Sequence, residues 1–256
     1  MNGTEEKIAT VGVIEGPGWH DPTADDISST LGDSVTVLRE PLDVAGFNWS
    51  LSDMAGSRAA IEQSAAKLSD RGCTHVLQAG PAFAYMLAGS ISGGRELEIE
   101  IGRVAGCTMI MSGAAMHAAM QSINAAEVAL VCPYYDEAWK SWLIRLLRND
   151  GYQVRSYANF LDAGVFASHD QIVARSYDFA PWEVEACVRH ACDTAQDAGG
   201  GIDAIWVAGA GVRTLSWARD IGERLGAPVI GADWALMRGL MISLGVESPL
   251  VKLPRG

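Results

Sequence analysis

The sequence contains no apolar run of the roughly 18 residues that a helix needs to cross a bilayer. Basic residues are also few: 19 lysines and arginines stand against 31 aspartates and glutamates, which gives a formal net charge of −12. An acidic protein repels nucleic acid and anionic membrane surfaces, so neither is an expected partner. A small-molecule carboxylic acid is still an expected partner, because backbone N–H groups inside a pocket outweigh the net charge.

Cysteine and metal-binding patterns are sparse as well. The five cysteines are odd in number and scattered, and Cys187 and Cys192 do not have a zinc or redox spacing. Histidines and carboxylates form no set with metal-ligand spacing, so no metal is expected. The polar segment 1–7 lacks the layout of a signal peptide, and we expect a protein of the reducing cytoplasm.

Nucleotide-binding motifs are missing too. The segment Gly209-Ala210-Gly211 lacks the third glycine and the early position of a dinucleotide fingerprint, and the chain has no Walker sequence. NAD and ATP are therefore not expected. The sequence predicts a protein that works without a cofactor.

Short apolar runs alternate with helical patterns along the whole chain. Hydrophobic residues make up 49% of the chain and charged residues 20%, as in soluble globular proteins with a substantial core. The expected strands cover residues 8–14, 34–38, 75–78, 107–111, 127–132, 153–157, 204–207 and 228–230. The expected helices cover residues 57–69, 96–104, 114–123, 136–149, 181–196, 215–225 and 234–244. This alternation predicts an α/β fold with mainly parallel sheets.

The chain also carries a coarse internal repeat. Residues 8–17 resemble residues 127–135, and the turn at Gly80 resembles the turn at Gly209. Two such half-chains predict two pseudo-symmetric lobes, each a mainly parallel sheet flanked by helices, with the active site in the cleft between them. The expected lobes are residues 1–112 with 231–256, and residues 113–230; no linker rich in Pro, Gly or Ser marks the boundary.

Two of the predicted strands end in turns of small residues. Residues 74–82 and 204–211 each run from a short apolar strand through such a turn into a helical pattern. This arrangement delivers backbone N–H groups and a helix dipole to an anion, although a tight turn needs small residues for packing alone. Neither turn contains a side chain that could act as nucleophile, acid or base.

Groups that could transfer a proton or bind a carboxylate follow other strands. Glu15 ends the first strand near Trp19, and such an apolar wall could raise the pKa of its carboxyl. Cys132 could act as a thiolate, but a cysteine at a strand end is most often an inert part of the core. Tyr134 could bond a carboxylate, and Arg213 could either pair with one or lie on the surface.

The histidines have positions typical of structural residues. His20 beside Asp21 could form a proton relay, but a solvated loop explains the pair as well. His169 falls in a polar loop, whereas His75 and His117 are expected to pack in a strand and a helix.

Five segments, in their order and spacing, resemble the aspartate/glutamate racemase superfamily, in the branch with arylmalonate decarboxylase and maleate cis-trans isomerase. They are residues 76–85, 106–108, 128–136, 203–211 and 224–230. The resemblance runs over most of the chain. It implies two pseudo-symmetric α/β lobes with a cofactor-free active site between them, which acts on the carbon next to a carboxylate. Members often form dimers, which leaves a homodimer open here.

The resemblance also implies catalytic thiols that this chain lacks. Racemases and isomerases of the superfamily use two cysteines and the decarboxylase uses only the second, but Gly80 and Gly209 stand at these positions here. Pro81 has no N–H and Ala82 no hydroxyl, so two donors of a decarboxylase-like hole are also missing. The tyrosine of the decarboxylase falls on Tyr134. The proton-transferring group must therefore come from elsewhere.

The expected catalytic residues are Glu15, Cys132 and Tyr134. The expected substrate-binding residues surround the two turns: Gly80, Pro81, Ala82, Tyr135, Gly209, Ala210, Gly211 and Arg213. The leading hypothesis is a cofactor-independent lyase, similar to a decarboxylase, or an isomerase that acts on a small carboxylic acid through a carbanion or enediolate. One alternative is a hydratase or hydrolase with Glu15 as general base on a bulkier acid. Another is a non-catalytic carboxylate-binding protein.

Overall fold

The computed structural model describes residues 8–17, 21–48, 50–176 and 178–249, which form two parallel sheets of four strands. The first sheet contains β1 (Ala9–Glu15), β2 (Val35–Pro41), β3 (His75–Gln78) and β4 (Thr108–Met111). The second contains β5 (Glu127–Val131), β6 (Gln153–Ala158), β7 (Ala204–Val207) and β8 (Val229–Gly231).

The two sheets share one strand order. The first runs β2-β1-β3-β4 and the second β6-β5-β7-β8, with every neighbouring pair parallel. Ile14 pairs with Gln78 in the first sheet, and Val131 pairs with Val207 at the same place in the second. The predicted α/β fold with two pseudo-symmetric lobes is confirmed.

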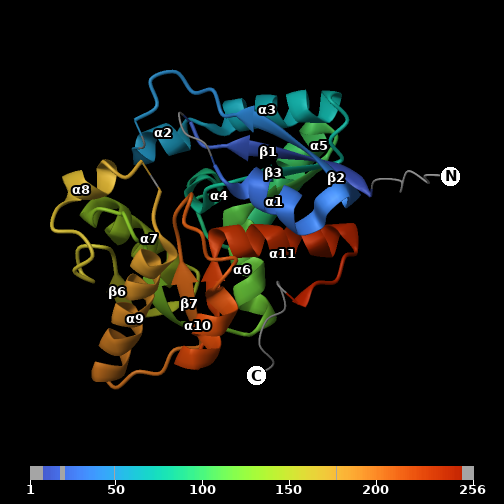
Figure 1. Cartoon of the computed structure of the whole chain (residues 1–256). Helices are drawn as coiled ribbons and strands as arrows, with labels where there is room; N and C mark the ends of the chain where they lie inside the picture. Colours follow the sequence, from blue (N-terminus) through green and yellow to red (C-terminus); the bar gives the residue numbers. More distant parts are fainter. Residues whose placement is uncertain (1–7, 18–20, 49, 177, 250–256) are drawn as a thin grey trace.

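Helices flank both sheets, which explains the continuous apolar strands (Figure 1). Residues such as Val11 and Val13 in β1 and Leu130 in β5 have no exposed surface. The first half contains α1 (Thr23–Leu31), the 3₁₀ turn η1 (Gly32–Ser34), α2 (Leu51–Ala55), α3 (Arg58–Asp70), α4 (Pro81–Ala88) and α5 (Gly94–Ala105). The rest are α6 (Ser112–Ser122), α7 (Glu137–Asn149), α8 (His169–Val173), α9 (Pro181–Asp197), α10 (Ala218–Leu225) and α11 (Ala232–Leu244).

Two helices form the seam between the lobes. Helix α6 connects β4 of the first sheet to β5 of the second, and α11 follows β8 of the second sheet. These helices pack against each other, and α11 also contacts β3 and β4 of the first sheet (Figure 1). The predicted lobe boundaries, at 112/113 and 230/231, stay a prediction.

Two predicted segments differ in the structure. The helix expected from residue 215 begins at Ala218, because the N–H groups of Thr214 and Leu215 donate to the Asp233 carboxylate over 2.6 and 2.9 Å. The polar loop expected at His169 is the start of α8, where the Ser168 hydroxyl accepts from the N–H of Gln171. The loop expected at Trp19 and His20 lies outside the described residues.

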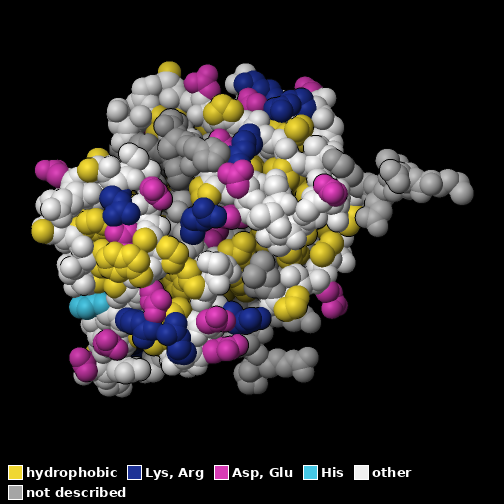
Figure 2. Space-filling view, viewed as in Figure 1, with side chains coloured by type: hydrophobic (Ala, Val, Ile, Leu, Met, Phe, Trp, Pro, Cys, Tyr) yellow, Lys and Arg dark blue, Asp and Glu magenta, His cyan; other side chains and the backbone are white. Residues whose placement is uncertain are grey.

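The described helices include none that is both long and apolar enough to cross a membrane. Acidic and basic side chains are mixed over the face shown in Figure 2, with apolar side chains exposed between them. This face therefore presents no uniform charge to a partner.

Candidate active site

The larger of two neighbouring cavities lies between the lobes and has a volume of about 360 Å³. Its lining comes from the loop before α2, from α2 and the start of α4 in the first lobe, and from α7, α8 and the β7–α10 turn in the second. The lining residues are Asn48, Met54, Gly80, Pro81, Ala82, Phe83, Tyr134, Tyr135, Asp136, Trp139, His169, Ile172, Val173 and Ala210. A cavity of this size and apolar character suits a small organic molecule.

The two glycine turns meet at the inner end of this cavity. Gly80 follows the last residue of β3 by two positions and Gly209 follows the last residue of β7 by two positions, so they are equivalent in the two lobes. Their φ angles are +95° and +133°, a region that favours glycine. A Cβ at residue 80 would lie 3.5 Å from the Cβ of Ala210, which brings the two turns into contact.

Tyr134 places its hydroxyl at the second of these turns. The hydroxyl donates to the carbonyl oxygen of Ala210 over 2.9 Å. A Cβ at residue 209 would lie 3.0 Å from Cε1 of Tyr134 and 3.1 Å from its hydroxyl oxygen, so this ring fills the space that a side chain there would need. The ring stacks on Phe179 at 6.0 Å and meets the ring of Tyr135 edge-on at 5.4 Å.

The backbone at this turn offers unused donors. Within the part of the chain that the structure describes, the N–H groups of Ala210 and Gly211 donate to no protein acceptor. An N–H left in this state binds an anion or water readily. On the facing turn, Pro81 at the first position of α4 has no N–H to offer.

The larger cavity is poor in charge. None of its lining residues, all described, is a lysine or arginine. Asp136 is the one carboxylate there, and its Oδ1 accepts the N–H of Trp139 over 2.9 Å as the cap of α7. A substrate carboxylate in this cavity would therefore depend on N–H, hydroxyl and imidazole donors.

His169, Ile172 and Val173 form one face of α8 that lines this cavity. The sequence predicts a solvated polar loop at His169, whereas the structure has His169 in this helix. The i, i+3, i+4 spacing of these three residues was the available signal, but a helix of five residues is too short for the pattern to stand out.

Glu15 and Cys132 occupy equivalent positions in the two lobes. Glu15 follows Ile14, which pairs with Gln78, and Cys132 follows Val131, which pairs with Val207. Neither residue is among those that line the two neighbouring cavities. Glu15 forms an ion pair with Arg39 of β2, which also contacts Asp25 over 2.5 Å. Cys132 has no exposed surface, and burial raises the pKa of its thiol well above the ordinary value. The catalytic roles predicted for Glu15 and Cys132 stay predictions.

A smaller cavity of about 10 Å³ lies on the other side of the contact between the two turns. Gly80 and Ala210 line both cavities. The other residues of the smaller one are Asp21, Pro22, Thr23, Ala79, Ser112, Gly209, Gly211, Val212, Arg213, Ala232, Asp233 and Leu236. The predicted substrate-binding residues are thus divided: Pro81, Ala82 and Tyr135 line the larger cavity, and Gly209, Gly211 and Arg213 the smaller.

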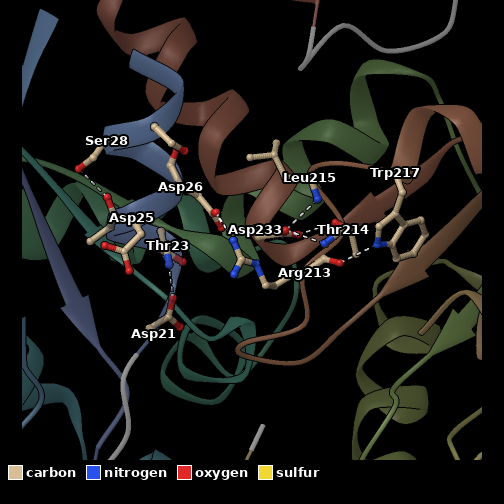
Figure 3. Close-up of polar contacts among 12 residues, drawn as sticks. Asp21, Thr23, Asp25, Asp26, Ser28, Arg213, Thr214, Leu215, Trp217 and Asp233 are labelled. Atoms are coloured by element: carbon tan, nitrogen blue, oxygen red, sulfur yellow. Dashed lines mark hydrogen bonds and ion pairs between the residues drawn. The ribbon is translucent and has the colours of Figure 1, made fainter. Parts of the chain in front are cut away.

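Arg213 is held by a carboxylate from the other lobe. Its guanidinium forms an ion pair with Asp26 of α1 (Figure 3). Burial raises the pKa of the Asp26 carboxyl, and the charge of Arg213 opposes this shift. The predicted contact of Arg213 with a substrate therefore competes with this ion pair.

Asp233 is a half-buried residue that clamps the β7–α10 connection. Its carboxylate accepts three hydrogen bonds (Figure 3). Two come from the N–H groups of Thr214 and Leu215, and the third comes from the Thr214 hydroxyl. Burial raises the pKa of this carboxyl, and these hydrogen bonds oppose the shift. The clamp fixes the backbone that follows the Gly209 turn.

Two other described histidines, His117 and His75, have structural partners. His117 Nδ1 lies 2.8 Å from the Tyr152 hydroxyl, and His75 Nε2 lies 3.0 Å from the Ser243 hydroxyl. Among the described residues, no three His, Cys, Asp or Glu side chains gather in a geometry that could hold a metal ion.

No protein-family model and no curated protein matches the chain. Solved structures do. Arylmalonate decarboxylase is 15% identical with a TM-score of 0.69, and the match covers 93% of this chain and 94% of that one. A mutant maleate isomerase of Pseudomonas putida with bound maleate is 18% identical with a TM-score of 0.72, over 95% of each chain.

A third match is the maleate cis-trans isomerase of Nocardia farcinica, in a cysteine-to-serine mutant with a covalently bound succinylcysteine intermediate. It is 16% identical with a TM-score of 0.64, over 93% of each chain. At these identities the matches establish the fold. The chain therefore has the two-lobed α/β fold of arylmalonate decarboxylase and the maleate isomerases.

Proposed function

We propose that this protein is a cofactor-independent lyase or isomerase that acts on a small carboxylic acid through a carbanion or enediolate. The observation that carries the proposal is the unused N–H of Ala210 beside the Tyr134 hydroxyl, at the inner end of a cavity of small-molecule size. The likeness of the fold to a decarboxylase and to maleate isomerases supports the class of reaction.

The carboxylate of the substrate would bind at the inner end of the cavity. The N–H of Ala210 would donate to one oxygen, and the Tyr134 hydroxyl would turn from the Ala210 carbonyl to the other. When the bond at the neighbouring carbon breaks, negative charge moves onto these oxygens, and hydrogen bonds from the two donors stabilise it. Phe83, Trp139 and Ile172 would surround the rest of the substrate.

Glu15 and Cys132 have no part in this proposal. The side chain of Glu15 is held by Arg39, and the thiol of Cys132 is fully buried. Hydration or hydrolysis with Glu15 as general base stays an untested alternative. Of the three predicted catalytic residues, Tyr134 is the one that lines the larger cavity.

A carboxylate-binding protein without chemistry is the second candidate. It is favoured by one observation: the lining of the larger cavity contains no thiol. It predicts that a carboxylic acid binds and leaves unchanged.

Proton NMR in D₂O with a panel of aryl- and alkylmalonates, maleate, hydroxy acids and unsaturated acids tests the proposal. Deuterium at the carbon next to the carboxylate, or release of carbon dioxide, supports carbanion chemistry. Binding of a panel member without either signal, measured by saturation transfer in the same samples, supports the binding protein instead.

A further inference from the structure

The smaller cavity has the size and the chemistry of a site for one water molecule. Its volume of about 10 Å³ is close to the room that a single water needs. A buried water also needs two or more polar partners. Ser112 and Asp21 both line this cavity, and both residues are 1% exposed.

Ser112 supplies the first partner. Its Oγ is buried and has no hydrogen-bond partner among the described residues. A buried hydroxyl without a hydrogen-bond partner destabilises a protein, and a water in the adjoining cavity would remove this cost.

Asp21 supplies the second partner. Its Oδ1 accepts the N–H of Thr23 over 2.8 Å, and Nη1 of Arg39 donates to its main-chain carbonyl over 3.1 Å. Burial raises the pKa of the Asp21 carboxyl, the hydrogen bonds from Thr23 oppose this shift, and the charges of Glu15 and Asp26 add to it. A carboxyl in such a setting holds its proton to higher pH than an exposed one.

The wall between the two cavities is thin. Gly80 and Ala210 belong to both linings, so the two cavities adjoin at these residues. A water behind this wall is close to the place where the proposed carbanion would form.

We propose that the smaller cavity holds one water molecule, bound by Ser112 and Asp21, which delivers a proton to the carbanion in the larger cavity. When the contact between Gly80 and Ala210 opens, the water gives one proton to the carbon and receives one from the Asp21 carboxyl. Asp21 is left as a carboxylate and regains its proton from solvent. The relay rests on the proposed function, whereas the water site does not.

The water site is tested by high-resolution crystal structures of the wild type, Ser112→Ala and Ser156→Ala. Ser156 is a matched control, because its Oγ is also buried without a partner among the described residues and it lines neither cavity. We expect density for one water within hydrogen-bond distance of Ser112 and Asp21 in the wild type and in Ser156→Ala, and none in Ser112→Ala. A wild type without this water, or Ser112→Ala with it, overturns the site.

The relay is tested by deuterium incorporation with the acid that the NMR panel identifies. Asp21→Asn should lower the exchange rate by about a hundredfold with little change in KM, as expected for loss of a proton donor. Full exchange in Asp21→Asn overturns the relay and leaves the proposed function standing. A wild type that exchanges no panel acid overturns the proposed function and the relay together, while the crystal structures still decide the water site.

Discussion

Gly80 and Ala210 meet across the two lobes: a Cβ on Gly80 would lie 3.5 Å from the Cβ of Ala210. Each residue belongs to a turn at the carboxyl end of a central strand, one in each sheet. Two cavities, of about 360 Å³ and about 10 Å³, adjoin at this contact. The proposed chemistry uses both sides of this contact.

Replacing Tyr134 with phenylalanine tests whether its hydroxyl takes part in the proposed reaction. Tyr134→Phe removes the hydroxyl at the inner end of the cavity, and we expect turnover to fall about a hundredfold, as for loss of one donor to a developing oxyanion. Tyr152→Phe is the control, because it removes a hydroxyl with a 2.8 Å contact to His117 outside both cavities. Equal turnover in the two variants would contradict the role of Tyr134.

Residue 209 should need to be glycine for two reasons: its φ is positive, and a side chain there would collide with its neighbours. In Gly209→Ala the new Cβ would lie 2.9 Å from Cγ2 of Val212 and 3.0 Å from Cε1 of Tyr134. Gly226→Ala is the control, because its φ is also positive, at +73°, but its Cβ would meet no atom within 4 Å. In urea unfolding we expect a loss of about 1–2 kcal/mol in the control and a further 1–3 kcal/mol or so in Gly209→Ala. Equal losses would mean that the packing around Tyr134 adapts freely.

Arg213 is expected to join the lobes rather than to bind the substrate. Its side chain is 52% exposed, so Arg213→Gln should lower the free energy of unfolding by less than about 1 kcal/mol. The KM for the acid substrate should change by less than about threefold. Arg219→Gln, at the same exposure but paired with Asp220 at 3.7 Å on one helix, is the control. A large rise in KM for Arg213→Gln alone would restore the predicted substrate contact.

The stability of Asp21→Asn should depend on pH in a direction set by the raised pKa. Because the pKa of Asp21 lies above its ordinary value of 3.8, the folded chain binds more protons at this site than the unfolded chain between the two values. The contribution of Asp21 to stability is therefore complete below 3.8 and is lost as the pH rises through the folded pKa. We expect Asp21→Asn to exceed the wild type in stability near neutral pH, and the difference to shrink on acidification.

Asp53→Asn provides the opposite case. The N–H of Asn48 and hydrogen bonds from Ser50 lower the pKa of the Asp53 carboxyl. Its contribution is present above the unfolded pKa and is lost as the pH falls, so this variant should be less stable than the wild type at neutral pH and approach it in acid. Urea unfolding of both variants over a pH series would show the two signs, and a shared sign would contradict the assignment.

The thiols should react slowly in the folded protein. Burial raises the pKa of Cys107 to about 11, of Cys187 to about 12 and of Cys192 to about 11, and Cys132 is fully buried. With iodoacetamide near neutral pH, followed by mass spectrometry, we expect the half-buried Cys107 to be labelled first and Cys132 only on unfolding. Fast labelling of Cys132 would return it to the candidate catalytic groups.

The fold was predictable because the same alternation of apolar runs and helical patterns recurs along the whole chain. Apolar runs such as Val128–Val131 recur with helical patterns between them, and buried parallel strands need that composition on both faces. The start of α10 was not predictable, because it depends on Asp233, which lies 18 residues after Leu215 in the sequence.

The site was predictable only where the backbone defines it. The turns at Gly80 and Gly209 could be located from the sequence, and the structure brings Gly80, Ala210 and Tyr134 to one cavity. The side on which a strand-end residue points depends on sheet register, which the sequence does not reveal, and so Cys132 could not be separated from Tyr134. His169 lines the cavity from a helix of five residues, which is too short for its i, i+3, i+4 spacing to stand out in the sequence.

The seam of α6 and α11 determines how the lobes can move. The chain passes from one sheet to the other through α6 and returns through α11, and these two helices are packed together. The two helices that connect the lobes would act as one hinge axis, because sliding or twisting of one lobe against the other would break the packing between α6 and α11. Because Gly80 and Ala210 belong to different lobes, a rotation about this axis would change their contact, and entry of a ligand would then be linked to joining of the two cavities.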